Sequence, residues 1–272
     1  MSLEEAKSLL REYRIVPNKL LGQNFMVDAS LYSTLSSYAA LSSDDVVLDA
    51  GAGFGFLTRF LSNKAKAVIA VEKDPKVAVV LREQVQHLAN ITVIEGDVLK
   101  ATLPPFNKVI SIPPYYLSSR LVMWLLDRGL DCAVLILQKE FARRLVASLG
   151  SDEYGWLAVV TYQGAETEPL DAVPRWMFYP QPEVDSVVVR LKPWPKPPFP
   201  VKDPVFFRRL SKWLFTQRNK KLDNALVPFI RSELKLDKKQ AAEMAAGLPI
   251  QGARVREMAP ADFGAIADAL CV

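Results

Sequence analysis

The chain has 272 residues, of which 50% are hydrophobic, and a formal net charge of +4. This length suits one large domain or a large domain with a small one. No apolar run reaches the roughly eighteen residues of a membrane span, and the N-terminus is charged, so the sequence predicts neither a transmembrane helix nor a signal peptide.

Cysteine and histidine are too sparse to suggest a metal centre. Cys132 and Cys271 lie far apart without a CxxC motif, and the single His87 lies in the polar stretch REQVQHLAN. We therefore expect no disulfide framework, no bound metal and a reducing cytoplasmic location. Any chemistry must proceed without a histidine base.

From residue 46 onward, short β-branched runs alternate with amphipathic stretches. This alternation predicts a mostly parallel sheet with helices on both faces. Two later runs, 156–164 (WLAVVTYQG) and 185–193 (DSVVVRLKP), are expected to be strands that pair antiparallel at one edge. The predicted strands before them are 46–50, 67–74, 91–97, 108–113 and 132–140, and the predicted helices are 56–64, 75–88, 119–129 and 140–149.

A proline-rich stretch, KPWPKPPFPVKDP, interrupts this pattern and favours an extended connector. The chain beyond it is helix-like, so we expect a first domain over 1–194 and a small helical domain over 195–272. Nine basic residues against two acidic ones lie between Lys192 and Asp223. Such a run is explained either by a solvated helix face or by an anionic partner such as nucleic acid.

A glycine turn, GAGFG at 51–55, follows the first predicted strand and opens a helix. Glycine there allows positive φ and close approach of a ligand to the backbone. Asp49 precedes the turn, and Glu72 and Asp97 end the next two strands, where carboxylates could bind ribose hydroxyls and an exocyclic amine. No Gly-Lys-Ser/Thr follows, so the pattern favours an adenosine ligand without a pyrophosphate, such as S-adenosylmethionine.

With these motifs in order, the chain resembles the ribosomal RNA adenine dimethyltransferases over nearly its whole length. The resemblance implies a Rossmann-like class I methyltransferase domain, with a seven-stranded mostly parallel sheet, and a small basic C-terminal helical domain. The matching segments are NKLLGQNFMVD, VVLDAGAGFGFLT, AVEKD, IEGD, QKEFARRL, YGWLAV, FYPQPEVDSVVVRL, FTQRNKKLDNAL and RVREMAPADF.

The resemblance also implies a role for each matching residue. Glu72 would bind the ribose and Asp97 the adenine amine of the cofactor, and Tyr115 and Phe178 would sandwich the target adenine. The implied cofactor-binding residues are Asn24, Met26, Gly51, Gly53, Glu72, Lys73, Asp97 and Ile112. The implied catalytic residues are Ile112, Pro113, Tyr115 and Phe178, and the implied RNA-binding residues are Arg208, Arg209, Lys212, Arg218, Lys220 and Lys221.

One position departs from the family pattern. The family carries Asn-Leu/Ile-Pro-Tyr/Phe at the fourth strand end, where the asparagine side chain and a following backbone carbonyl hold the target amine. Here the tetrad is Ile112-Pro113-Pro114-Tyr115. Ser111 is a poor substitute, because neighbouring side chains on a strand point to opposite faces.

Three functions therefore stay open on the sequence alone. The first is methylation of adenine N6 in small-subunit rRNA, with S-adenosylmethionine as cofactor and the immature small ribosomal subunit as partner, by a monomer. The second is a catalytically weak or inactive ribosome-assembly factor of the same fold, which Ile112 favours. The third is methylation of another target, such as large-subunit rRNA, DNA or a protein side chain.

Overall fold

The computed structural model describes residues 2–18, 21–250 and 252–271. The chain packs into two compact units, one of Met1–Ala142 with Thr167–Pro193 and one of Arg143–Glu166 with Trp194–Val272. The division predicted from the sequence assigned residues 143–166 to the first domain, whereas in the structure they pack with the C-terminal helices.

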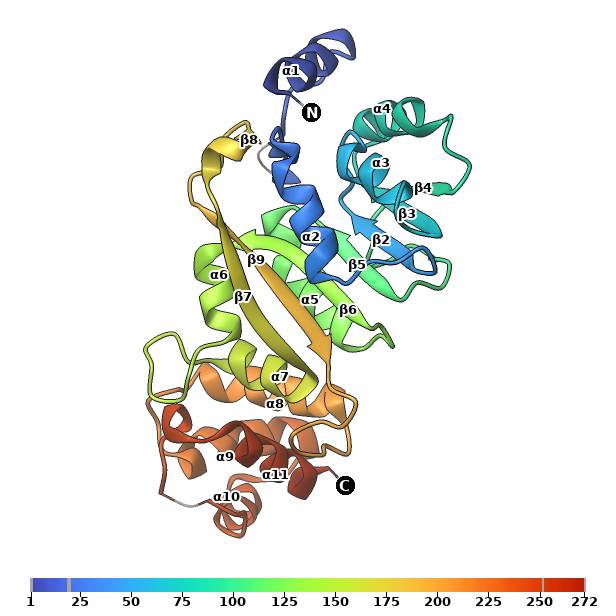
Figure 1. Ribbon diagram of the computed structural model, residues 1–272. Helices are drawn as coiled ribbons and strands as arrows, with labels where there is room; N and C mark the ends of the chain where they lie inside the picture. The colour runs from blue at the N-terminus through green and yellow to red at the C-terminus, as the bar shows by residue number, and fades with distance from the viewer. Residues whose placement is uncertain (1, 19–20, 251, 272) are drawn as a thin grey trace. The chain divides into compact units, whose positions relative to one another are not determined.

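A seven-stranded sheet forms the centre of the first unit. Its strands are β2 (Val46–Ala50), β3 (Ala67–Glu72), β4 (Ile91–Glu95), β5 (Lys108–Ser111), β6 (Cys132–Gln138), β7 (Ala165–Val173) and β9 (Ser186–Pro193). Their order in the sheet is β4-β3-β2-β5-β6-β9-β7 (Figure 1). Strands β2 to β6 pair in parallel and β9 pairs antiparallel with β6, which confirms the predicted mostly parallel sheet.

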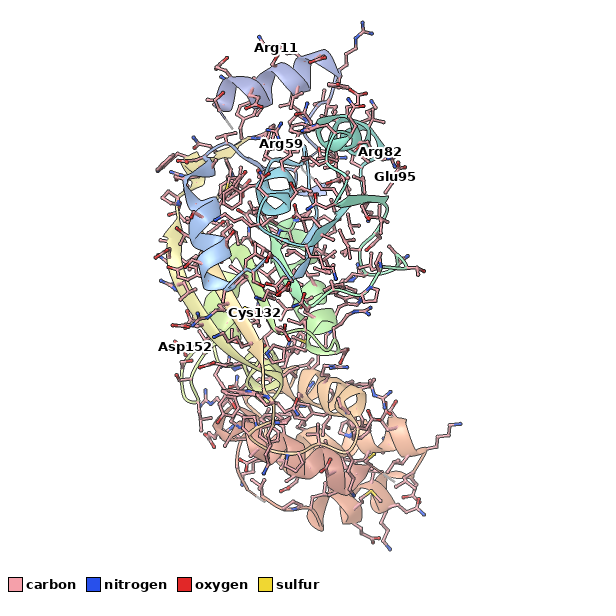
Figure 2. The ribbon with its side chains drawn as sticks, turned by 45° about the vertical axis from the view of Figure 1, so that its right-hand side comes forward. Arg11, Arg59, Arg82, Glu95, Cys132 and Asp152 are labelled. Carbon is pink, nitrogen blue, oxygen red and sulfur yellow. The ribbon has the colours of Figure 1, made fainter. Side chains whose placement is uncertain are left out.

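Helices cover both faces of this sheet. Alternate strand residues such as Val47, Val68 and Ile110 form one core with Leu35 and Leu61, so their face is covered by α2 and α3. Helix α4 contributes Val77 and Val80 to the same core and packs against β3 and β4, where an ion pair joins its Arg82 to Glu95 on β4 at 2.8 Å (Figure 2). The helices of this part of the chain are α1 (Leu3–Glu12), α2 (Tyr32–Tyr38), α3 (Phe56–Ser62), α4 (Pro75–Val85), α5 (Ser118–Leu126) and α6 (Lys139–Leu145).

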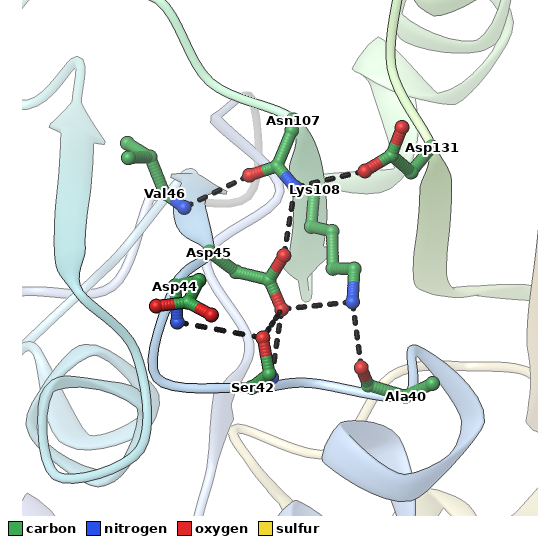
Figure 3. A network of polar contacts seen from close by, with 8 residues as sticks. All are labelled: Ala40, Ser42, Asp44, Asp45, Val46, Asn107, Lys108 and Asp131. Carbon is green, nitrogen blue, oxygen red and sulfur yellow. Dashed lines mark hydrogen bonds and ion pairs between the residues drawn. The ribbon is translucent and has the colours of Figure 1, made fainter.

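The amino-terminal ends of three parallel strands are joined by a buried polar network (Figure 3). Lys108 Nζ on β5 lies 2.8 Å from the Asp45 carboxylate, and both side chains are almost wholly buried. The Asn107 amide donates to Asp45 at 2.7 Å and to Asp131 at 2.9 Å, and its oxygen accepts from the Val46 N–H at 2.9 Å. This network sets the register of β2, β5 and β6 at the edge of the sheet opposite the glycine turn.

The prediction of a strand over 156–164 is wrong, because these residues form helix α7 (Trp156–Gly164). Five successive residues, 157–161, are buried, and a short apolar run buried on all sides has no periodicity that separates strand from helix. The seventh strand is instead the polar β7 that follows. It lies at the sheet edge and contains Pro169, which suits an edge strand because proline cannot donate a ladder hydrogen bond.

A second, two-stranded sheet connects the N-terminal segment to the chain before β9. Strand β1 (Phe25–Met26) pairs antiparallel with β8 (Phe178–Tyr179), with Met26 opposite Phe178. The Val27 N–H extends the pairing by donating to the carbonyl of Met177 at 2.8 Å. The pairing brings Asn24 and Phe178 close together, although more than 150 residues separate them in sequence.

The second unit is helical. Helix α8 begins with a proline after an aspartate N-cap. The Asp203 side chain accepts hydrogen bonds from the N–H groups of Val205 and Phe206. The ring of Phe215 stacks on Phe263 with centroids 5.3 Å apart, which joins the first and last of the C-terminal helices. Besides α7 these helices are α8 (Pro204–Phe215), α9 (Leu222–Leu234), α10 (Lys238–Ala246) and α11 (Pro260–Leu270).

Both cysteines are free thiols, with Cys132 buried at the start of β6 (Figure 2). Among the residues that the structure describes, no helix is long and apolar enough to cross a bilayer. The same residues contain no cluster of three or more His, Cys, Asp or Glu side chains that could hold a metal ion.

Candidate active site

The glycine turn lies at the carboxyl edge of the sheet and approaches the β5 strand end closely. Gly51 has φ +83°, and a Cβ there would lie 2.7 Å from Cδ of Pro114. Its N–H and that of Ala52 both donate to the carbonyl of Val71 on β3. Glycine is therefore required at 51 by both backbone conformation and space.

The Glu72 carboxylate is held rigidly at the end of β3. One oxygen accepts the N–H of Gly53 at 2.9 Å, and the other accepts those of Lys73 and Asp74, each at 2.8 Å. Burial raises the pKa of Glu72 above its ordinary value, against the opposing effect of these three N–H donors. The side chain is thus pre-oriented as a hydrogen-bond acceptor facing the glycine turn.

Asp97 lies two residues beyond β4 and close to Lys73. Its Oδ2 is 3.5 Å from Lys73 Nζ, and its Oδ1 accepts the Leu99 N–H at 3.1 Å. The same lysine lies over the ring of Tyr116, with Nζ 5.7 Å from the centroid. Lys73 therefore connects the β4 end of the site with the β5 end.

These elements enclose one cavity of about 730 Å³, counted to its open mouth. That volume lies within the range of about 300–1,000 Å³ usual for small-molecule sites. The structure brings ten of the predicted site residues to this cavity. They are Asn24, Gly51, Gly53, Glu72, Lys73, Asp97, Ile112, Pro113, Tyr115 and Phe178.

Met26 does not line this cavity but an adjoining one, which also reaches Asn24, Gly51 and Ile112. The buried Asp49 lines this second cavity, and its carboxylate accepts the Thr58 hydroxyl at 2.7 Å. Burial raises the pKa of Asp49 to about 7, opposed by the Thr58 hydrogen bond and assisted by the nearby Glu72 charge.

At the end of β5, the neighbouring residues Ser111 and Ile112 have different surroundings. Ser111 is fully buried, and its hydroxyl donates to the carbonyl of Ala50 at 3.2 Å. Ile112 lines both cavities, whereas Ser111 lines neither. The apolar Ile112 side chain thus forms part of the cavity wall, and the Ser111 hydroxyl is hydrogen-bonded to the backbone of β2.

The two predicted base-stacking residues line the same cavity from different elements. Tyr115 starts a 3₁₀ turn after β5, and its hydroxyl lies 2.6 Å from that of Ser186 on β9. Phe178, on β8, is only 2% exposed. Phe178 thus borders the cavity although almost none of its surface is exposed.

The six predicted RNA-binding residues lie in the second unit, on α8 and in the loop before α9. Arg209 pairs with Glu233 at 2.6 Å, and Arg218 donates to the carbonyl of Asp152 at 3.1 Å. Lys212 Nζ lies 5.7 Å from the centroid of the Trp156 ring. Lys220 and Lys221 are exposed at the end of the loop. The remaining residue is Arg208, on α8.

The fold adds several residues to those predicted for the site. Pro114 and Tyr116 line the main cavity beside Tyr115, and the doubled Pro-Pro and Tyr-Tyr at this strand end already indicated an active-site wall, although neither residue was among those predicted. Arg256 and Arg254 lie beside the basic loop, since the Arg256 N–H donates to the Arg218 carbonyl at 3.0 Å. Only the tertiary pairing of these two loops brings them to one place.

Comparison with known proteins places this site in a family. The family model described as "Ribosomal RNA adenine dimethylase" matches residues 16–259. A protein of Methanothermobacter thermautotrophicus named probable ribosomal RNA small subunit methyltransferase A is 38% identical over 97% of this chain and 94% of its own. A protein of the same name from Methanosarcina acetivorans is 41% identical over 81% of each chain.

Solved structures agree. A dimethyladenosine transferase from Plasmodium falciparum superimposes with a TM-score of 0.72 at 25% identity, covering 88% of this chain and 94% of that one. The 23S rRNA methyltransferase ErmE gives a TM-score of 0.63 at 27% identity, covering 92% of this chain and 100% of that one. The protein therefore belongs to the ribosomal RNA adenine dimethylase family.

Proposed function

We propose that the protein transfers methyl groups from S-adenosylmethionine to N6 of adjacent adenines in small-subunit rRNA. The observation that carries the proposal is the convergence of the glycine turn, Glu72, Asp97, Tyr115 and Phe178 on one cavity in a member of this family. Relatives at 38–41% identity are named for the small-subunit activity, which favours that target over the 23S rRNA of ErmE.

The donor set of the cavity fits the cofactor. Glu72 keeps acceptor capacity for a ribose hydroxyl on the oxygen that accepts only the Gly53 N–H, and Asp97 could accept from the adenine amine. Gly51 lines the cavity without a side chain, so a ligand could lie against its backbone. Asn24, Gly53 and Lys73 complete this part of the wall, and Met26 would contribute from the adjoining cavity. When bound, S-adenosylmethionine supplies a methyl group that its sulfonium already activates.

The protein's own part in the reaction is geometric and electrostatic. The N6 lone pair of adenine is delocalised into the ring and must be turned toward the methyl group. Tyr115 and Phe178 would fix the base by stacking, and the Pro113 carbonyl would accept an N–H of the amine. The amine nitrogen would gain the methyl group that the sulfonium of the cofactor supplies, and it would lose one proton to water. Ile112 offers no side-chain acceptor, so the second N–H is left to backbone or water.

The basic residues of the second unit would contact rRNA phosphates. Their positions on α8 and the following loop, together with the exposure of Lys220 and Lys221, support this part of the proposal. We further propose that the protein acts as a cytoplasmic monomer on immature small subunits, which sedimentation of the purified protein alone and with such particles would test.

The test is methylation of small-subunit particles from cells that lack the modification. Purified protein and isotopically labelled S-adenosylmethionine should yield N6,N6-dimethyladenosine in the small-subunit rRNA, read by mass spectrometry of digested RNA. The Asp97→Ala variant should lose cofactor binding and product together, whereas Lys238→Ala on the exposed start of α10 should behave as wild type.

Ile112 supports one competing function, the catalytically weak assembly factor of the same fold. Calorimetric binding of S-adenosylmethionine and binding to particles, with no methyl mark on small-subunit RNA, would select it. A mark found only on parallel samples of large-subunit particles would contradict the proposed target.

A further inference from the structure

The amino-terminal end of β9 contacts both sides of the predicted base-stacking site. Ser186, the first residue of β9, is fully buried, and its Oγ lies 2.6 Å from the Tyr115 hydroxyl. The preceding Asp185 accepts the backbone N–H of Arg175 at 3.1 Å through its carboxylate. Arg175 begins the 3₁₀ turn that leads directly into Phe178. Two consecutive residues therefore hold the elements that carry the two aromatic rings.

This end of β9 is better anchored than either ring. β9 pairs along its length with β6, with Ser186 opposite Gln138. The carbonyl of Asp185 also accepts the N–H of Lys139, the residue after β6, at 3.1 Å. In contrast, Tyr115 belongs to a three-residue turn and Phe178 to a two-residue strand. Short elements of this kind have few backbone hydrogen bonds of their own, so side-chain bonds contribute more to their orientation.

The Tyr115–Ser186 bond also defines the ring orientation. Tyr115 is half-buried, and burial raises the pKa of its hydroxyl, which therefore stays protonated at neutral pH. Either hydroxyl can donate to the other, and the bond restricts the swing of the whole ring about the Cα–Cβ bond, because the hydroxyl oxygen moves with that swing. A ring free to swing would lie in the stacking position for only part of the time.

We propose that Asp185 and Ser186 are positioning residues, which hold Tyr115 and Phe178 in the orientation that admits and stacks one adenine. The inference rests on the proposed function of the same cavity. Neither residue needs to touch substrate or cofactor, since both act through the aromatic walls. The buried Ser186 bond should matter more than the exposed Asp185 bond, because water competes for the latter.

The experiment compares Ser186→Ala and Tyr115→Phe, which remove the same hydrogen bond from opposite sides. Each should lower kcat about 3- to 10-fold, as expected for one neutral hydrogen bond. KM for the particle should change less, because phosphate contacts dominate RNA affinity. The double variant should be no slower than either single variant, since there is only one bond to lose. Ser186→Thr, which keeps the hydroxyl, should recover most of the rate.

A spectroscopic readout separates orientation from general damage. Small-subunit RNA carrying 2-aminopurine at the target position should fluoresce weakly when the base is stacked in wild type, and more strongly in Ser186→Ala and Tyr115→Phe. Asp185→Ala should show a smaller change, about 2-fold in rate, and Asp185→Asn, which keeps an acceptor oxygen, should remain near wild type. Ser62→Ala is the matched control, because Ser62 is a buried serine whose hydroxyl donates only to the α3 carbonyl of Arg59.

The inference is overturned if Ser186→Ala and Tyr115→Phe match Ser62→Ala in rate and fluorescence, or if their effects multiply in the double variant. Should Ser186→Ala fail to fold, Tyr115→Phe and Ser186→Thr still decide the question. Failure of the proposed function looks different, because wild type itself would then leave small-subunit RNA unmethylated.

Discussion

Gly51 and Pro114 face each other so closely that a single methyl group on Gly51 would lie 2.7 Å from the proline ring. The contact joins the glycine turn after β2 to the turn after β5, and both turns line the candidate cofactor cavity. The two turns thus pack directly against each other in the wall of this cavity.

Substitution Gly51→Ala should therefore weaken both cofactor binding and folding. The new Cβ meets Pro114 and adopts φ +83°, so we expect a loss of more than about 2 kcal/mol in the free energy of unfolding. Gly150→Ala is the control, since Gly150 has φ +88° with no atom within 4 Å of a new Cβ, and should lose only about 1 kcal/mol. Urea unfolding and calorimetry with S-adenosylmethionine measure the two effects; equal losses in both variants would contradict the steric argument.

Restoring the amide at position 112 should increase the methylation rate. Ile112→Asn places an acceptor in the cavity wall, and one preorganised polar group of this kind is worth about 10²–10³ in rate. We expect at least a 10-fold rise in kcat with unchanged cofactor affinity, measured by single-turnover methylation of small-subunit particles. Ile112→Val, which stays apolar, should show no rise. An unchanged rate in Ile112→Asn would mean that backbone and water already hold the amine.

Asp49 should make folding stability fall as the pH rises from about 4 to about 7. Its pKa is raised from 3.8 to about 7 in the folded protein, so over this interval the unfolded chain releases a proton that the folded chain retains. Stability from this group is complete below pH 4 and is lost as the pH passes through 7. Chemical denaturation of Asp49→Asn between pH 4 and 8 should show a smaller decline than the parent protein, and the remaining decline is expected from Glu72, whose pKa is also raised by burial.

Asp45, in contrast to Asp49, should make folding stability fall as the pH is lowered into the acid range. Burial alone would raise its pKa, but hydrogen bonds from Lys108, Asn107 and Ser42 outweigh burial and lower the pKa from 3.8 to about 2. The stability it contributes is present above pH 4 and lost as the pH falls to 2, by about 1–2 kcal/mol after allowance for solvent screening. At pH 7, Asp45→Asn leaves Lys108 buried without a counter-charge and should lose about 3 kcal/mol. Acid titrations of the parent protein and of Asp45→Asn by circular dichroism measure the pH range over which this stability is lost.

The loop between α8 and α9 is expected to contribute to RNA affinity through charge. Replacing Arg218, Lys220 and Lys221 together by Ala should weaken RNA binding and reduce the slope of log K against log salt by about 2. Fluorescence anisotropy with small-subunit RNA at several salt concentrations measures this slope. The control is Lys238→Ala/Lys239→Ala, which removes exposed charge from α10. An unchanged slope in the triple variant would mean that the RNA phosphates lie elsewhere.

The sequence by itself determined the alternation of strands and helices from β2 to α6, the glycine turn and the acids at successive strand ends. These features are local, because alternation of β-branched and amphipathic runs and the punctuation by glycine depend on neighbouring residues only. They were enough to predict the parallel sheet and to bring Glu72 and Asp97 to one edge. The apolar run at 156–164 was misassigned because local pattern cannot separate a buried helix from a buried strand.

Only the tertiary structure decided which residues that are distant in sequence contact each other around the cavity. The pairing of β1 with β8 brings Phe178 to the cavity, and the register of β9 on β6 puts Ser186 against Tyr115. The direction of Ile112 into the cavity, with Ser111 bonded to β2, likewise follows from strand geometry in three dimensions. Such contacts join residues far apart in the chain, such as Ser111 and Ala50, which are 61 residues apart, and Tyr115 and Ser186, which are 71 apart. Their geometry depends on packing of the whole sheet, which no local pattern encodes.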